Sequence, residues 1–275
     1  MKKTGAEIVW EMLKREGVDV TFGIPGGAIM HTYHPRQDYG IRHVLMRHEQ
    51  CTAHAADGYA RMSGKVGVAI ATSGPGATNL ITGIANAAMD SAPIVCITGQ
   101  VPTSLIGTDA FRETDITGCT LPVTKHNYLV TDVADLAETI HEAFYIARSG
   151  RPGPVLIDLP KDVQINSTEF VPPDGDPELP GYHPPQRGEL DMVEQAAQLI
   201  NEAERPMILA GQGVLMSGAM DALRRFAELT KTPVGLTLLG KGGFPESHPL
   251  ALGMMGMHGE AYVNQAIQES DLLLA

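Results

Sequence analysis

The sequence has few cysteines, few aromatic residues and no long apolar run. Its three cysteines, Cys51, Cys96 and Cys119, are odd in number and form no CxxC pair, so a disulfide framework or a zinc ribbon is not expected. No apolar stretch reaches the roughly 18 residues of a membrane span, and residues 1–17 lack the apolar core of a signal peptide. These absences predict a soluble protein of a reducing compartment.

Positive charge is also scarce. Lysine and arginine number 20 against 32 aspartates and glutamates, which gives a formal net charge of −12. Such a balance argues against nucleic acid or an anionic membrane as the main partner, because both repel a negatively charged protein. Small anionic metabolites remain possible ligands, since a local site can override the net charge.

Apolar residues, in contrast, are plentiful and follow alternating helical and strand patterns. Hydrophobic residues make up 43% of the 275. Thr4 and Glu7 form a capping-box pattern at the start of a helix, and Gly64 is placed to end another that begins near residue 49. Strands are predicted at 18–24, 41–48, 65–73, 92–99 and 153–160, with helices between them. Several strands are apolar on both faces, which predicts an α/β fold with an open parallel sheet and helices on both faces.

A proline-rich stretch interrupts this alternation. Residues 166–187 contain Pro172, Pro173, Pro177, Pro180, Pro184 and Pro185. Such a segment is extended and semi-rigid, which is typical of an interdomain linker. We therefore predict a first domain at 1–165, a linker at 166–187 and a second α/β domain at 188–275. That second domain is expected to be incomplete, because "ESDLLLA" ends inside an apolar run typical of a buried strand.

The segment "RHEQCTAH", residues 47–54, superficially suggests a zinc site. His48 and His54 are six residues apart, which on a helix places them about 240° apart in rotation and about 9 Å apart along the axis. Two zinc ligands must lie much closer than this. His48 and Cys51 could share a helix face, but such pairs are common by chance. No metal ligand is predicted in this chain.

Glu49 in the same segment has two interpretations. A glutamate in the first turn of a helix is favoured by the helix dipole alone. Glu49 also follows a predicted strand at its carboxyl end, where open α/β sheets bind their ligands. A carboxyl group there could act as an acid or a base.

Two glycine-rich segments join predicted strands to helices. "SGPGATN", residues 73–79, allows close backbone approach and free helix N–H groups, but it lacks the lysine and Ser/Thr of a P-loop. A tight turn is an equally good explanation. "GIPGGA", residues 23–28, lacks the GxGxxG spacing, so a dinucleotide site is not favoured there.

Taken in order, these segments resemble one family. "FGIPGGAIM", "RHEQ", "ATSGPGATN", "SAPIVCITGQVPTSLIG", "TKHNYLV" and "RPGPVLIDLPKDVQ" are similar to the N-terminal half of the acetolactate (acetohydroxyacid) synthase large subunits. The resemblance extends from about residue 4 to 275. It implies a cytoplasmic, thiamine diphosphate-dependent transferase of isoleucine and valine biosynthesis, which joins pyruvate to a second 2-ketoacid to form acetolactate or acetohydroxybutyrate.

The resemblance also implies cofactors and partners. Thiamine diphosphate would bind with Mg²⁺, whose ligands belong to a C-terminal domain with a GDG…N motif that is missing here, and FAD would bind the second domain. The first domain is implied to bind the pyrimidine of the cofactor. A homodimer or tetramer is implied, because two subunits share each site, and a regulatory small subunit is a possible partner.

Individual roles follow residue by residue from the resemblance. Glu49 would be catalytic, donating to the pyrimidine N1′ and so promoting loss of the proton on C2 of the thiazolium ring. Substrate contacts are implied for Ala28, Phe111, Arg112 and Lys125. Cofactor contacts are implied for Gly26, Gly27, Glu49, Pro75 and Asn79, and FAD contacts for Gly211, Gly213, Thr237, Leu238, Gly253, Met257 and His258. Without the resemblance, a solvated loop lysine would be an equally good explanation of Lys125, and core packing would be the better explanation of the methionine pair in "GMMGMHG".

Two positions depart from the family pattern. Arg112 stands where the family usually has glutamine, so a side chain that only donates replaces one that also accepts. Cys51 stands where glycine is usual. Two other functions therefore stay open: a sister thiamine diphosphate enzyme, such as a 2-ketoacid decarboxylase or glyoxylate carboligase, and a non-catalytic fragment unable to bind the whole cofactor. Glyoxylate carboligase typically lacks the glutamate, so Glu49 counts against it.

Overall fold

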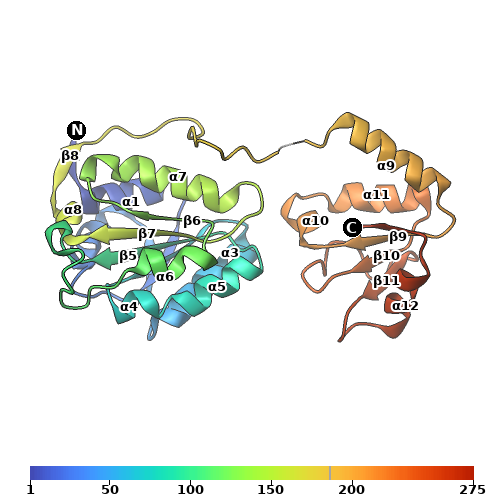
Figure 1. Ribbon diagram of the computed structural model, residues 1–275, viewed down its shortest axis with the longest axis horizontal. Helices are drawn as coiled ribbons and strands as arrows, with labels where there is room; N and C mark the ends of the chain where they lie inside the picture. The colour runs from blue at the N-terminus through green and yellow to red at the C-terminus, as the bar shows by residue number, and fades with distance from the viewer. Residues whose placement is uncertain (186) are drawn as a thin grey trace. The chain divides into compact units, whose positions relative to one another are not determined.

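The protein divides into two compact α/β units, each with its own parallel sheet (Figure 1). The structure, a computed structural model, describes residues 1–185 and 187–275. The first unit ends at Pro185, and the described part of the second begins at Arg187. None of the described helices combines the length and apolar character that crossing a membrane requires.

The sheet of the first unit has six strands in the order β3-β2-β4-β5-β7-β6, and every neighbouring pair is parallel. Its strands are β2 (Val20–Gly23), β3 (Arg42–Leu45), β4 (Gly67–Ala71), β5 (Ile94–Gln100), β6 (His126–Leu129) and β7 (Val155–Pro160). The predicted parallel sheet is therefore confirmed. The edge strand β6 was not predicted, because its sequence, His-Asn-Tyr-Leu, is only partly buried and lacks a continuous apolar run.

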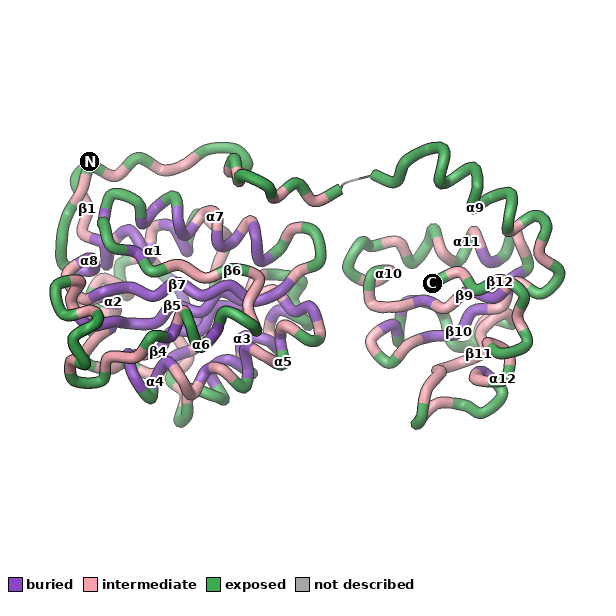
Figure 2. The backbone as a smooth tube through the Cα atoms, viewed as in Figure 1, coloured by how far each residue is buried: buried purple, intermediate pink, exposed green. Residues whose placement is uncertain are grey.

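Helices cover both faces of this sheet, and Figure 2 shows the buried strands between them. Along β4, Val68 and Ile70 belong to one core, whereas Ala69 and Ala71 belong to the other, because successive side chains point to opposite faces. The first core packs against α1 (Gly5–Arg15), α7 (Leu136–Arg148) and α8 (Lys161–Ile165). The second packs against α3 (Glu49–Ser63), α4 (Pro75–Thr78), α5 (Ile81–Met89) and α6 (Ile116–Thr120).

Local signals set the ends of two of these helices as predicted. In α1, the Glu7 amide donates to Thr4 Oγ1 at 3.3 Å and the Thr4 amide donates to Glu7 Oε2 at 2.7 Å, which completes the capping box. Helix α3 ends at Gly64, whose φ of 71° is left-handed. At its start, His48 Nδ1 accepts from the Gln50 amide at 3.1 Å. His48 is therefore a helix cap.

The proline-rich segment packs on the first unit along much of its length. Strand β8 (Ser167–Glu169) pairs antiparallel with β1 (Lys2–Thr4). Phe170, Leu179 and Tyr182 pack against the first core. The prolines rule out a regular helix but not docking, because an extended chain can still place apolar side chains on a neighbouring surface.

The second unit has four parallel strands in the order β11-β10-β9-β12. They are β9 (Pro206–Ala210), β10 (Val234–Leu236), β11 (Ala251–Met254) and β12 (Leu272–Leu274), and the helices are α9 (Leu190–Glu202), α10 (Gln212–Met216), α11 (Met220–Thr230) and α12 (Ala261–Glu269). Its core includes Ile208, Val234 and Phe244. Strand β12 was predicted to be buried, but as an edge strand it leaves Leu273 40% exposed.

Candidate cofactor site at the carboxyl edge of the first sheet

Most of the predicted site residues of the first unit gather where the strand order reverses, with Lys125 as the exception. The chain leaves β2 for β3 on one side, and β4 then pairs with β2 on the other side. Ligands of open α/β sheets bind beyond the carboxyl ends of strands at such a switch point. Three connections meet there: residues 24–29 after β2, residues 46–49 after β3 and residues 72–79 after β4.

Glu49 and Asn79 are brought into direct contact. Glu49 is the first residue of α3 and is half-buried, and its Oε2 accepts a hydrogen bond from Asn79 Nδ2 at 3.0 Å. Asn79 ends α4. The second carboxyl oxygen, Oε1, faces Gly76, where an added Cβ would lie 3.5 Å from it. One oxygen of Glu49 is thus held in place, while the other lies beside a glycine with no side chain to cover it.

Thr72 joins the two glycine-rich connections. Its Oγ1 accepts from the Ala28 amide at 3.3 Å. A Cβ added to Gly26 would lie 2.5 Å from Thr72 Cβ, and one added to Gly76 would lie 2.7 Å from Thr72 Cγ2. Both glycines are therefore required for close approach. Sequence reasoning did not single out Thr72, although its place between a buried strand and "SGPG" is a usable signal.

Phe111 and Arg112 lie on the connection from β5 to α6, which contacts the turn after β4. A Cβ on Gly74 would lie 2.9 Å from the carbonyl oxygen of Arg112, so these two backbones touch. Gly74 and Arg112 both have left-handed backbones, with φ of 60° and 62° respectively. The Arg112 guanidinium lies 5.1 Å from the centre of the Phe111 ring, which is 86% exposed. This places both residues next to the turn that carries Asn79.

Lys125 is not brought to this edge. It precedes β6 and therefore lies at the amino edge of the parallel sheet, opposite to Glu49. Its Nζ donates to the carbonyl oxygens of Ile146 and Ser149 and, at 2.8 Å, to the Tyr182 hydroxyl. Within the first unit, Lys125 ties α7 to the proline-rich segment.

The residues predicted to contact FAD also share one edge of their sheet. Gly211 and Gly213 follow β9, Thr237 and Leu238 follow β10, and Gly253, Met257 and His258 are in or after β11. The Thr237 amide donates to the Ala210 carbonyl at 3.1 Å, which ties the first two turns together. Met257 is 93% exposed, so core packing does not account for it.

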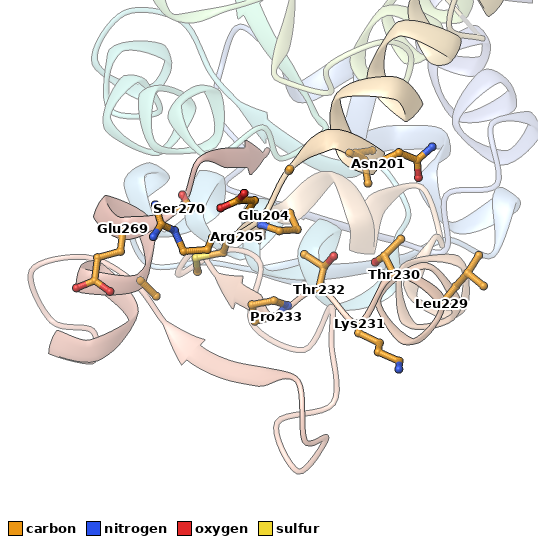
Figure 3. Close-up of a pocket in the computed structure, with 15 residues that line it drawn as sticks. Asn201, Glu204, Arg205, Leu229, Thr230, Lys231, Thr232, Pro233, Glu269 and Ser270 are labelled. Atoms are coloured by element: carbon orange, nitrogen blue, oxygen red, sulfur yellow. The ribbon is translucent and has the colours of Figure 1, made fainter.

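A cavity of about 750 Å³ lies at the other edge of the second sheet, near the amino ends of β9 and β10 (Figure 3). Arg205, Lys231, Glu204 and Glu269 are among its lining residues, and none of the predicted FAD residues is. Thr232 Oγ1 is buried there without a hydrogen-bond partner. The mixed charges of the lining do not specify a class of ligand.

Neither metal nor thiol chemistry has a candidate centre in the described parts of the chain. No cluster of three or more His, Cys, Asp or Glu side chains is arranged there to hold a metal ion. All three cysteines are free, and burial raises the pKa of the Cys96 thiol to about 12, so that it stays protonated. The carboxyl and amide at the switch point are the main polar groups of the site.

Comparison with known proteins agrees with this geometry. Residues 3–119 match the family described as thiamine pyrophosphate enzyme, N-terminal TPP binding domain, and residues 193–275 match its central domain. Thiamine pyrophosphate is thiamine diphosphate under another name.

Curated relatives include a probable acetolactate synthase large subunit of Methanocaldococcus jannaschii, 54% identical over 98% of this chain and 46% of its own length. The acetolactate synthase large subunit of Corynebacterium glutamicum is 52% identical over 100% of this chain and 44% of its own length. That of Parasynechococcus marenigrum is also 52% identical, over 99% and 45%. The chain thus spans a little under half the length of these relatives. Because residues 3–119 and 193–275 match two domains of one family in succession, the chain belongs to the thiamine pyrophosphate enzymes.

Proposed function

We propose that this chain provides the pyrimidine-binding half of the active site of an acetolactate synthase. The observation that carries the proposal is Glu49, half-buried at the switch point, with one carboxyl oxygen held by Asn79 and the other beside Gly76. The relatives that match 98% and 100% of this chain are named as acetolactate synthase large subunits, probable in one case, and this supports the acetolactate synthase reaction.

The residues at this edge fit an aminopyrimidine. A flat heterocycle needs a cradle without side chains and one carboxyl group in its plane, and Gly26, Gly76 and Glu49 supply these. Asn79 would orient the carboxyl group, and Glu49 Oε1 would hold a proton at the ring nitrogen N1′. When bound, thiamine diphosphate supplies the carbon nucleophile that adds to the keto carbon of pyruvate.

The remaining roles extend this proposal. Ala28, Phe111 and Arg112 would contact a ketoacid bound beside the cofactor, and the Arg112 guanidinium suits the carboxylate of a second 2-ketoacid. We further propose that Mg²⁺ binds outside these residues and that FAD binds along the carboxyl edge of the second sheet. We also propose that the enzyme is a homodimer or tetramer with a regulatory small subunit as a partner, and that it acts in isoleucine and valine synthesis in the cytoplasm.

Glu49→Gln tests the assignment most directly. Glutamine keeps an oxygen that can accept from Asn79 but cannot exchange a proton with N1′. We expect exchange of the thiamine diphosphate C2 proton with deuterium, followed by NMR in the enzyme that carries this chain, to slow by about 100- to 10,000-fold. Glu7→Gln changes another first-turn glutamate, in α1, and should leave the exchange unchanged. An unaltered exchange rate in Glu49→Gln would refute the role of Glu49.

Product analysis separates the rival reaction. With pyruvate as substrate, the proposed carboligation predicts acetolactate as the main product. Acetaldehyde without acetolactate would show a sister decarboxylase instead, and the Arg112 departure makes this comparison informative.

A further inference from the structure

Gln100 lies at the carboxyl end of β5, and its side-chain amide joins both ends of the following connection. It is 4% exposed. Its Oε1 accepts from the Val101 amide at 2.9 Å, and its Nε2 donates to the Thr114 carbonyl oxygen at 2.8 Å. Residues 101–115, which we call the substrate loop, are thus closed at their base by one side chain.

Asp158 on the neighbouring strand β7 holds this amide in place. Its Oδ2 accepts from Gln100 Nε2 at 2.8 Å, and its Oδ1 accepts from Thr98 Oγ1 at 2.7 Å. Thr98 and Asp158 are direct partners in the β5–β7 pairing, and all three side chains are buried. Both amide hydrogens and the amide oxygen of Gln100 are therefore used, which allows only one orientation of the side chain.

Other ties stiffen the substrate loop along its length. Asp162 accepts from the Thr103 amide at 3.0 Å. The Glu113 carboxylate accepts from the Gly107 amide and, at 2.9 Å, from the Ala110 amide. A loop held at its base and folded on itself presents Phe111 and Arg112 at a defined place. The backbone contact between Arg112 and Gly74 then sets this place against the turn that leads to Asn79.

We propose that Gln100, fixed by Asp158, is a positioning residue that sets the substrate loop, with Phe111 and Arg112, against the turn at Gly74. The part of this inference that concerns substrate rests on the proposed function. The hydrogen bonds described above that fix the loop all lie within this chain, so the order of the loop can be measured without any ligand. Holding two substrate-facing side chains within a fraction of an ångström is what second-substrate addition requires.

The first test measures loop order in the unliganded chain. Gln100→Met keeps the volume and removes all three hydrogen bonds. We expect amide hydrogen exchange over residues 101–115 to quicken by about tenfold or more. Gln164 is the matched control, because it is also buried and ties Ala28, Thr32 and Leu159 instead. Gln164→Met should quicken exchange around residues 28–32 and 159–164, but not over residues 101–115. Unchanged exchange over 101–115 in Gln100→Met would overturn the proposal.

The second test asks whether the loop acts on substrate. In the enzyme that carries this chain, Gln100→Met should raise the KM for the 2-ketoacid about tenfold or more, while C2 proton exchange of thiamine diphosphate stays within about twofold of the unsubstituted protein. Equal losses in both would show a general structural defect and overturn the positioning role. If the unsubstituted protein shows neither C2 exchange nor product, the proposed function fails, and the unliganded loop measurement still stands by itself.

A further pair of variants guards against misfolding of Gln100→Met. Asp162→Ala removes only the tie to Thr103 and should quicken exchange locally, at residues 103–106. Asp158→Asn retains an oxygen that can accept from Gln100 and should leave loop exchange within about twofold. Loosening of the whole loop by Asp162→Ala, or by Asp158→Asn, would contradict the proposal that the contacts of Gln100 set the loop.

Discussion

The substitution Asp158→Asn should make the first unit more stable at neutral and alkaline pH. Burial raises the pKa of the Asp158 carboxyl to about 7 from an ordinary value of 3.8, although hydrogen bonds from Thr98 and Gln100 favour the charged form. The folded protein therefore keeps a proton that the unfolded chain has lost between about pH 4 and pH 7. Stability from this group falls as pH rises through that window and stays low above it.

The expected size follows from this shift. A pKa raised from 3.8 to about 7 corresponds to about 4 kcal/mol, because each tenfold change in proton affinity is worth about 1.4 kcal/mol. Asparagine has no such proton and can keep both contacts, since its oxygen can accept from Gln100 while its amide donates to the Thr98 hydroxyl. The free energy of unfolding of Asp158→Asn minus that of the unsubstituted protein should therefore grow by up to about 4 kcal/mol from pH 4 to pH 8.

Urea unfolding followed by tryptophan fluorescence measures this difference. Trp10 is the single tryptophan and is fully buried in the first unit, so the signal reports that unit alone. Asp38→Asn, at an exposed aspartate, controls for the loss of one negative charge. A difference that stays constant from pH 4 to pH 8, or that shrinks as pH rises, would refute the reasoning.

Two further predictions concern other contacts of the first unit. Lys125→Met leaves the carbonyls of Ile146 and Ser149 without their ammonium donor, so the free energy of unfolding in urea, monitored at Trp10, should fall by about 2–3 kcal/mol. Limited proteolysis near Tyr182 should also quicken, and unchanged stability and proteolysis would show that these contacts are unimportant. Gly26→Ala forces a Cβ against Thr72, so urea unfolding should show a loss of about 1–3 kcal/mol. Gly27→Ala has open space around its Cβ and should leave the free energy of unfolding of the unliganded chain nearly unchanged, and equal losses of stability in the two variants would contradict the close packing at Thr72.

Much of the fold could be predicted because its signals are local. Helix α1 begins at the Thr4–Glu7 capping box, α3 ends at Gly64, and the apolar runs of β4, β5 and β7 are fully buried. The missed elements are short or half-exposed. Strand β6 lies at a sheet edge, and β8 exists through its pairing with β1, a partner more than 160 residues away in the sequence.

The site divides in the same way. Glu49, Asn79 and the two glycine-rich turns could be identified from the sequence, because their motifs are contiguous and resemble one family. Their direct contact, and the distance of Lys125 from them, depend on which edge of the sheet each connection reaches. The roles of these residues in binding and catalysis remain predictions.

The sequence by itself determined the alternating pattern, the parallel sheets and the family, since burial on both faces and turn chemistry are local properties of the chain. Only the tertiary structure decided that Thr72 lies between Gly26 and Gly76, and that Gln100 and Asp158, 58 residues apart, share a buried hydrogen bond. The physical reason is that strand order brings distant residues together, and no local pattern records which side chains then meet.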